Sequence, residues 1–168
     1  QHLSKIIFEG PEDQLNLTAN TQPALMACSI ALLRVLEQES GKKIEEMCSY
    51  VAGHSLGEFT ALTAARAIEV GPCASLLRIR GQAMQDAVPV GMGAMFALLG
   101  GNIEAAQEIA KEASVVGVCN VANDNSPQQQ VLSGTVDAIN EAIKLATGRG
   151  FKAIKLNVSA PFHSDLMK

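Results

Sequence analysis

The pentapeptide Gly53-His54-Ser55-Leu56-Gly57 constrains the fold of this chain more than any other feature, because it matches the pattern G-x-S-x-G. In proteins with this pattern the serine occupies a sharp, strained turn between a strand and a helix, and the turn needs small neighbours. A short, mostly apolar run at 47–52 precedes the motif, and an alanine-rich run at 56–68 follows it. The sequence therefore predicts a strand, a turn and a helix, with Ser55 presented as a nucleophile at the helix N-terminus.

Two histidines are candidates for the base that a serine nucleophile needs. His54 adjoins Ser55, but neighbouring residues on a sharp turn usually point apart, so we interpret His54 as a support for the turn. His163 follows a predicted strand, in a loop that contains a proline, and this position suits catalysis. A surface histidine without a catalytic role fits the same pattern equally well.

Arg80 lies on a predicted helix that starts at Gly71-Pro72 and runs to about residue 88. It falls inside the apolar stripe of that helix, four residues after Leu76 and four before Met84, whereas Arg78 shares a face with two glutamines. A charge on a buried stripe needs a partner or a function. Because a guanidinium group can hold a carboxylate through two hydrogen bonds, Arg80 is a candidate for binding an acidic substrate, and a structurally paired arginine is the alternative.

The remaining pattern predicts an α/β fold with an inserted subdomain. Thr21-Gln22-Pro23 predicts the start of a helix that continues to residue 38. After a hinge at 89–93, the sequence predicts a strand, helix, strand, strand, helix and strand at 94–99, 103–113, 115–121, 129–133, 136–147 and 151–158. This order is that of the ferredoxin-like split motif. We therefore expect 1–90 to carry the serine turn as part of the main domain, 91–158 to form the ferredoxin-like subdomain, and 159–168 to return to the main domain.

Composition excludes several classes of function. The chain has 168 residues, of which 48% are hydrophobic, and a net charge of −4 without a basic cluster, so nucleic acid is not an expected partner. No apolar run approaches the length of a membrane span. The four cysteines lack the spacing of a metal site and predict reduced, buried thiols in a cytoplasmic protein; they are Cys28, Cys48, Cys73 and Cys119.

Together these motifs resemble the malonyl-CoA:acyl carrier protein transacylase family of fatty-acid synthesis, along essentially the whole chain. The residues that carry the resemblance are Thr21-Gln22-Pro23-Ala24-Leu25, Gly53-His54-Ser55-Leu56-Gly57-Glu58, Arg80-Gly81 with Met84-Gln85, Gly93-Ala94-Met95, Asn125-Ser126-Pro127 and Pro161-Phe162-His163. The resemblance implies an α/β-hydrolase-like core with a ferredoxin-like insert, which agrees with the pattern of elements.

The resemblance also implies a role for each site residue. Ser55 would be the nucleophile, His163 its general base, and the backbone N–H of Leu56 an oxyanion donor. Arg80 would bind the malonyl carboxylate, and Asn125 would lie near the substrate cleft. The substrates would be malonyl-CoA and the phosphopantetheine thiol of acyl carrier protein, used in a ping-pong reaction through a malonyl-serine. The pantetheine arm belongs to the substrates, so we expect no bound cofactor or metal.

Two parts of the family pattern are not among these residues. They are an amino-terminal segment of the Gly-Gln-Gly-Ser-Gln type, which the resemblance implies as a second oxyanion donor, and the carboxy-terminal region that orients the histidine. We therefore expect a fragment that is incomplete at both ends. Three alternatives remain open: a serine esterase or thioesterase, an acyltransferase domain of a polyketide-type synthase, and an inactive module that binds a carrier protein.

Overall fold

The computed structural model describes residues 2–89, 91–158 and 160–168. The chain forms two compact units, the first ending at Ala83 and the second beginning at Met84. The first is helical, and the second contains a four-stranded antiparallel sheet with helices. The prediction of a mixed α/β fold is thus confirmed.

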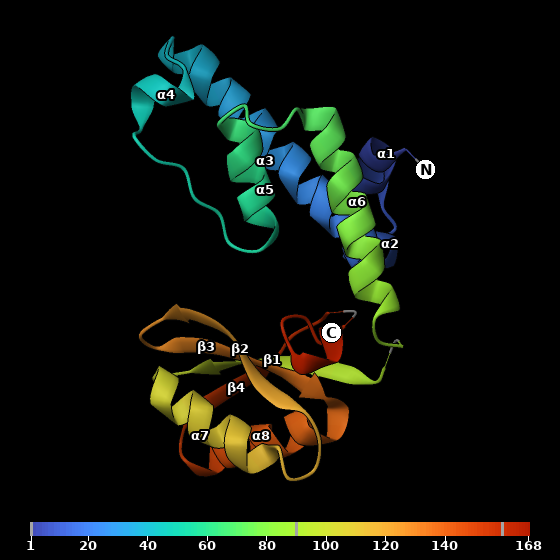
Figure 1. Cartoon of the computed structure of the whole chain (residues 1–168), viewed down its shortest axis with the longest axis vertical. Helices are drawn as coiled ribbons and strands as arrows, with labels where there is room; N and C mark the ends of the chain where they lie inside the picture. Colours follow the sequence, from blue (N-terminus) through green and yellow to red (C-terminus); the bar gives the residue numbers. More distant parts are fainter. Residues whose placement is uncertain (1, 90, 159) are drawn as a thin grey trace. The chain divides into compact units, whose positions relative to one another are not determined.

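The first unit is built around the long helix α3, Thr18–Ser40 (Figure 1). Its elements are α1 (Leu3–Glu9), α2 (Glu12–Asn16), α3 (Thr18–Ser40), α4 (Ile44–Met47), α5 (Leu56–Ala64) and α6 (Val70–Asp86), the last of which continues into the second unit. Met26 and Ile30 of α3 pack with Cys73 and Leu77 of α6 in a buried cluster. In each pair the residues are four positions apart, so each helix contributes one narrow apolar stripe.

Helix α6 confirms the helix predicted after residue 71, but its buried face differs from the predicted stripe. The structure buries Cys73, Leu77 and Gly81, while Leu76 is exposed. Arg80 is half-buried and adjoins Gly81. The Arg80 side chain therefore lies at the edge of the buried face of α6, and from there it reaches both α3 and α5.

Two predicted elements of the first unit differ from the structure. Helix α3 begins at Thr18, before the predicted start, and Pro23 lies inside it. The predicted strand at 47–52 is wrong: α4 ends at Met47, and among the described residues 48–54 have no strand partner. A strand exists through hydrogen bonds to a neighbouring strand, and an apolar run alone does not supply one.

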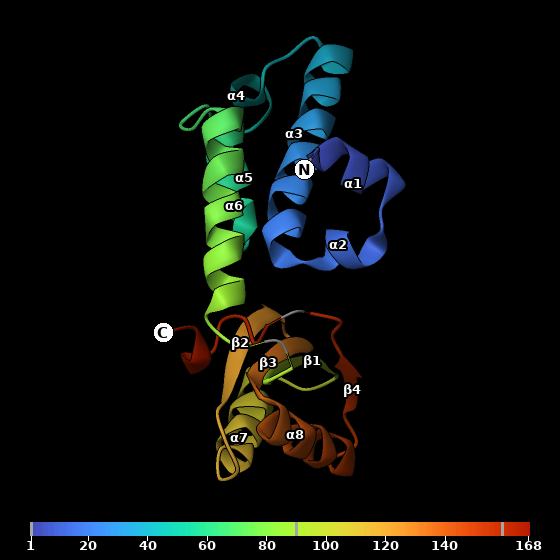
Figure 2. The same cartoon turned by 90° about the vertical axis from the view of Figure 1, so that its right-hand side faces the viewer.

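The second unit has the predicted order of strands and helices. Its elements are β1 (Gly93–Leu99), α7 (Ile103–Ala113), β2 (Cys119–Ser126), β3 (Gln129–Thr135), α8 (Val136–Gly148), β4 (Lys152–Lys155) and a 3₁₀ turn (Asp165–Met167). All pairings are antiparallel, in the spatial order β2-β3-β1-β4. Figure 2 shows α7 and α8 together on one face of this sheet. Strand β2 begins at Cys119 and extends to Ser126, so it starts and ends later than the strand predicted at 115–121.

Both faces of the central strands are covered. Phe96, Leu98 and Leu132 belong to the core that the sheet shares with α7 and α8. Side chains alternate along a strand, so the buried Met95 and Ser133 point to the other face. After β4 the Leu156 N–H donates to the Met95 carbonyl over 2.9 Å, which continues the pairing of β4 with β1 by one residue. Further along the chain, the buried Pro161 lies against Gly93 at the start of β1, just before His163.

The four cysteines are free thiols, as the sequence predicts, but only two are buried. Cys73 and Cys119 lie in the cores, whereas Cys28 and Cys48 are exposed. Burial raises the pKa of the Cys119 thiol to about 11. In the part of the chain that the structure describes, no helix combines the length and apolar character that crossing a membrane requires.

Candidate active site

Ser55 adopts a backbone conformation that few residues other than glycine tolerate. Its φ is 53° and its ψ is −112°, immediately before the first residue of α5. The turn is closed by two backbone hydrogen bonds, from Gly57 N–H to the His54 carbonyl over 2.8 Å and from Glu58 N–H to the Ser55 carbonyl over 3.2 Å. The predicted strained turn and the helix after it are therefore both present.

Gly53 is the glycine that this turn requires. A Cβ added to Gly53 would lie 1.9 Å from the carbonyl carbon and oxygen of Gly57, so no larger residue fits without moving the backbone. A Cβ added to Gly57 would meet no atom within 4 Å among the described residues. Close approach of the backbone thus explains the glycine at position 53 but not the glycine at position 57.

Arg80 reaches from α6 to the serine. Its Nη2 donates to Ser55 Oγ over 3.0 Å, and its Nη1 donates to Oε1 of Gln22. The guanidinium carbon lies 5.8 Å from the centre of the Phe59 ring, within the range of a cation–π contact. Burial lowers the pKa of Arg80, and the nearby Glu58 carboxylate opposes that shift. An arginine stays protonated in proteins, so the group beside Ser55 is a cation.

Gln22 orients Arg80, and the sequence analysis missed this role. Its side chain is buried, with Nε2 donating to Thr18 Oγ1 over 2.9 Å. That bond turns the carbonyl oxygen Oε1 toward Arg80. The sequence marked Gln22 as part of a helix start and of a family motif but not as a partner of Arg80, because no pattern in one sequence pairs residues that are 58 positions apart.

Gly81 explains how α6 comes so close to α3. A Cβ added to Gly81 would lie 2.6 Å from the Ala19 Cα and 2.7 Å from the Thr18 carbonyl oxygen. The absence of a side chain therefore brings the backbones of the two helices together where Arg80 reaches Gln22. Gly81 thus lets α6 approach α3 closely, and this approach brings the neighbouring Arg80 within reach of Gln22.

His163 belongs to the second unit and sits on a firmly anchored loop. It is exposed and has a φ of 57°, another unusual value for a residue with a side chain. Pro161 is fully buried, and a Cβ added to Gly93 would lie 2.3 Å from its Cγ. The buried Ser164 donates from Oγ to the Pro161 carbonyl over 2.7 Å. Burial on both sides of His163 thus holds its imidazole at the surface.

A second contact fixes the chain just after His163. The Asp165 N–H donates to Asn120 Oδ1 over 2.9 Å, and Asn120 Nδ2 donates to Asp165 Oδ2 over 3.2 Å. Hydrogen bonds from Lys168 and then from Asn120 lower the pKa of the Asp165 carboxyl. The sequence does not predict this pair, since neither residue stands in a distinctive motif.

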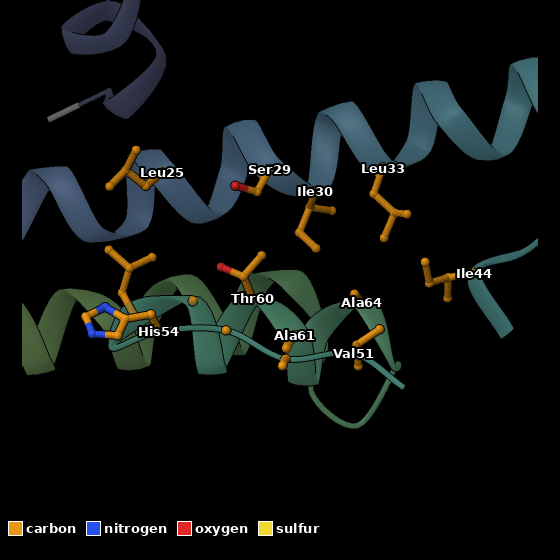
Figure 3. Close-up of a pocket in the computed structure, with 14 residues that line it drawn as sticks. Leu25, Ser29, Ile30, Leu33, Ile44, Val51, His54, Thr60, Ala61 and Ala64 are labelled. Atoms are coloured by element: carbon orange, nitrogen blue, oxygen red, sulfur yellow. The ribbon is translucent and has the colours of Figure 1, made fainter. Parts of the chain in front are cut away.

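The other three residues considered for the site are Asn125, Leu56 and His54, which lie in β2, at the start of α5 and just before α5 respectively. Asn125 is exposed near the end of β2, where the pairing with β3 is irregular. Leu56 is the first residue of α5, and N–H groups in the first turn of a helix lack an intrahelical acceptor. His54 lines a mostly apolar groove of about 580 Å³ between α3, α5 and residues 51–54, at the end where Leu25 lies across from it (Figure 3).

The first unit therefore brings Ser55, Arg80 and Gln22 together, while His163 and Asn125 belong to the second unit. Among residues 2–89, 91–158 and 160–168, no three side chains of His, Cys, Asp or Glu are grouped so that they could hold a metal ion. The first unit therefore places the hydroxyl of a serine directly beside the cation of an arginine.

Comparison with known proteins shows the family to which the chain belongs. The family model described as "Acyl transferase domain" matches residues 2–168. The malonyl CoA-acyl carrier protein transacylase of Bacillus subtilis strain 168 is 45% identical over 168 residues, which cover 99% of this chain and 51% of that protein. The chain thus spans about half the length of the curated relatives it matches.

Solved structures extend the comparison to the fold. The acyl-carrier-protein S-malonyltransferase of Bartonella henselae is 51% identical with a TM-score of 0.92, over 99% of this chain and 53% of that one. A malonyl-transacylase in complex with its type II PKS acyl-carrier protein is 41% identical with a TM-score of 0.90, over 98% of this chain and 52% of that one. The chain therefore belongs to the acyl transferase domain family, and the resemblance to malonyl-CoA:acyl carrier protein transacylases that its motifs predict is confirmed.

Proposed function

We propose that the full-length protein transfers a malonyl group from malonyl-CoA to the phosphopantetheine thiol of acyl carrier protein. "Full-length protein" here means a polypeptide of the relatives' length that carries these 168 residues. The hydrogen bond between Arg80 Nη2 and Ser55 Oγ is the observation that carries the proposal. In malonyl a single CH₂ separates the carboxylate from the thioester carbonyl. A carboxylate held by Arg80 therefore leaves the carbonyl carbon beside the nucleophile.

The comparisons support the same substrates. The relatives are named malonyl CoA-acyl carrier protein transacylases, and one related structure contains an acyl-carrier protein. All four cysteines of this chain are free, which suits the reducing cytoplasm. We place the protein there, as an acyltransferase of fatty-acid synthesis.

The first half-reaction loads the enzyme. Ser55 gives its proton to His163 and its oxygen attacks the thioester carbonyl carbon. The oxygen of that carbonyl becomes an oxyanion, which accepts a hydrogen bond from the backbone N–H of Leu56 at the start of α5. The C–S bond then breaks, and CoA leaves as the thiol with the proton from His163. The product is a malonyl ester on Ser55, whose carboxylate is still bound by Arg80.

In the second half-reaction the thiol of the carrier protein is the nucleophile and Ser55 is the leaving group. The thiol of the carrier protein gives its proton to His163, and its sulfur attacks the ester carbonyl. The C–O bond to Ser55 breaks, and Ser55 regains a proton from the imidazolium. No step requires a bound cofactor or a metal. Asn125 would lie near the cleft, and His54 would support the turn.

The architecture that goes with this reaction is also a proposal. In it, 1–90 are part of an α/β-hydrolase-like core that carries the serine turn, and 91–158 form a ferredoxin-like subdomain. Residues 159–168 return to the core and bring His163 to the site. The strand order of the second unit and the positive φ of Ser55 support this assignment.

Mass spectrometry of the intact full-length protein after exposure to malonyl-CoA tests the proposal. We expect one malonyl group per chain, on Ser55 by peptide mapping, and its release by a thiol acceptor. Ser55→Ala should abolish the adduct, while Ser75→Ala, which removes a hydroxyl of α6 that donates to the Gly71 carbonyl one turn earlier, should keep it. An adduct on a cysteine, or one released to water as fast as to the thiol, would contradict a serine transacylase.

A further inference from the structure

Pro23 leaves a gap in the hydrogen bonding of α3. It lies inside the helix, and proline has no backbone N–H. In an α-helix that N–H would donate to the carbonyl four residues earlier, which is the carbonyl of Ala19. Ala19 is buried, and a buried carbonyl without a donor costs about 1–3 kcal/mol. The structure therefore needs a donor from elsewhere at this point.

Arg78 of α6 supplies that donor. Its Nη1 donates to the Ala19 carbonyl over 3.0 Å and also to Oδ1 of Asn20. Asn20 is buried and is itself held by a bond from its Nδ2 to the Gln14 carbonyl over 2.7 Å. One guanidinium nitrogen thus replaces the missing proline N–H and connects α6 to the first turn of α3.

The two arginines of α6 hold α3 on both sides of the closest approach. Arg78 and Arg80 are two residues apart, so they leave the helix about 200° apart around its axis. Arg78 reaches Ala19, and Arg80 reaches Gln22. Gly81 provides the backbone contact at Ala19. Two anchors at different points of α3 fix both the rotation and the axial position of α6.

We propose that Arg78 is a positioning residue for Arg80. By binding the carbonyl that Pro23 leaves without a donor, it holds α6 in the register that places the Arg80 guanidinium on Gln22 and Ser55. Its effect on substrate choice rests on the proposed function, in which Arg80 binds the malonyl carboxylate. The bond from Arg78 to the Ala19 carbonyl, in place of the missing Pro23 N–H, does not depend on that function.

The first test is a double-mutant cycle in the full-length protein. Pro23→Ala returns an N–H to residue 23, which can donate to the Ala19 carbonyl within α3. Arg78→Met should lower the thermal unfolding midpoint in the original sequence, and by clearly less when Pro23→Ala is present. Equal losses in the two backgrounds would overturn the idea that Arg78 replaces the proline N–H.

The second test separates positioning from mere stabilisation. The ratio of malonyl to acetyl transfer, each measured as kcat/KM, should fall several-fold in Arg78→Met and recover partly in Arg78→Met with Pro23→Ala. Arg149→Met is the matched control, since it removes an arginine whose ion pairs, with Glu108 and Glu112 of α7, lie within the second unit. An unchanged ratio in Arg78→Met, with both rates lowered equally, would overturn the positioning role.

A failure of the proposed function would look different. If Arg80→Ala itself left the malonyl-to-acetyl ratio unchanged, the carboxylate-binding role of Arg80 would be wrong, and the effect of Arg78 on selectivity would fall with it. The stability cycle would still report whether Arg78 and Pro23 are coupled. The two measurements together therefore assign any failure to one proposal or the other.

Discussion

Arg80 Nη2 donates a hydrogen bond to Ser55 Oγ over 3.0 Å, so the cation and the hydroxyl of the serine turn are direct partners. Arg80→Ala in the full-length protein should lower kcat/KM for malonyl transfer. The loss of transition-state stabilisation should be about 2–5 kcal/mol, the cost of truncating one member of a desolvated charge pair. Acetyl transfer should fall less, because acetyl has no carboxylate. Parallel assays with malonyl-CoA and acetyl-CoA check this, and equal losses would mean that Arg80 is structural.

Arg80→Lys provides a finer version of the same experiment. Lysine keeps the positive charge but loses the planar fork that binds a carboxylate through two hydrogen bonds. We expect malonyl transfer between that of Arg80→Ala and that of the unchanged protein. Full activity with lysine would show that charge alone suffices and that the contact with Gln22 is dispensable.

Gly53→Ala should damage the serine turn much more than Gly57→Ala. The added methyl would collide with the Gly57 backbone at 1.9 Å in the first case and would meet no described atom within 4 Å in the second. Overpacking of this kind costs about 1–3 kcal/mol, and here it would also displace Ser55. Thermal unfolding and malonyl loading of both variants give the comparison. A loss at Gly57 as large as that at Gly53 would show that the turn is crowded on both sides.

The sequence predicted some elements well because their signals are local. Helix α7 has the predicted bounds, with four buried residues on one face and an N-cap at Asn102 whose side chain accepts from Ala105 N–H over 3.0 Å. The turn at Ser55 was also predictable, since its geometry requires a small residue at position 53. In these cases one short stretch of chain contains the whole cause of the structure.

Other features depend on partners that are distant in the sequence. The apolar run before the motif predicted a strand, yet among the described residues it has no neighbour to pair with. The start of α3 was misplaced because Pro23 suggested a first helical position, whereas Arg78 makes an interior proline tolerable. The contact of Arg80 with Gln22 was missed for the same reason. Long-range partners decide these features, and one sequence does not reveal them.

Phe162 should contribute to selectivity at the α-carbon of the acyl group. It is half-buried beside His163, and the family resemblance associates a phenylalanine at this position with malonyl rather than methylmalonyl. One methyl in a pocket changes the rate by only about 10–200-fold. We therefore expect Phe162→Ser to narrow the ratio of malonyl to methylmalonyl transfer without reversing it. Faster methylmalonyl transfer by the unmodified protein would refute this.

Glu37 should make the stability of the first unit sensitive to acid. This buried carboxylate accepts hydrogen bonds from Arg34 over 2.7 Å and from Ile44 N–H over 3.1 Å. The bond from Arg34 is the main cause that lowers the pKa of Glu37 below its ordinary value of 4.5, and burial opposes it. A lowered carboxyl pKa stabilises the folded state above the ordinary value, and that contribution is lost as the pH falls through the folded pKa.

Thermal unfolding between neutral pH and pH 3 checks this for three forms of the protein. The midpoint of the unmodified protein should exceed that of Glu37→Gln at neutral pH, and the difference should shrink as the pH drops below about 4.5. Glu39→Gln, at an exposed glutamate of the same helix, is the control and should change the pH dependence little. A constant difference across the range would show that the charge of Glu37 is not what stabilises the fold.

The last prediction concerns a polypeptide of only these 168 residues. Large apolar side chains are exposed on its first unit, including Leu32 at 71%, Tyr50 at 92% and Ile79 at 67%. Apolar surface of this extent favours association, so the purified chain should scatter light increasingly with concentration. The same residues in the full-length protein should scatter less at equal molarity. A monodisperse short chain would contradict this.

The catalytic rate of the short chain should be low for a separate reason. The family resemblance assigns one oxyanion donor and the group that orients the catalytic histidine to segments outside these residues. Loss of one oxyanion donor lowers kcat by about a hundred- to a thousand-fold, and a histidine in the wrong tautomer can cost about ten-thousand-fold. The two losses need not add, since catalytic groups act as a unit. Malonyl transfer measured on the monomeric fraction, where aggregation plays no part, should therefore fall at least a hundred-fold below the full-length rate. Equal turnover would show that Ser55, His163 and Arg80 suffice without those segments.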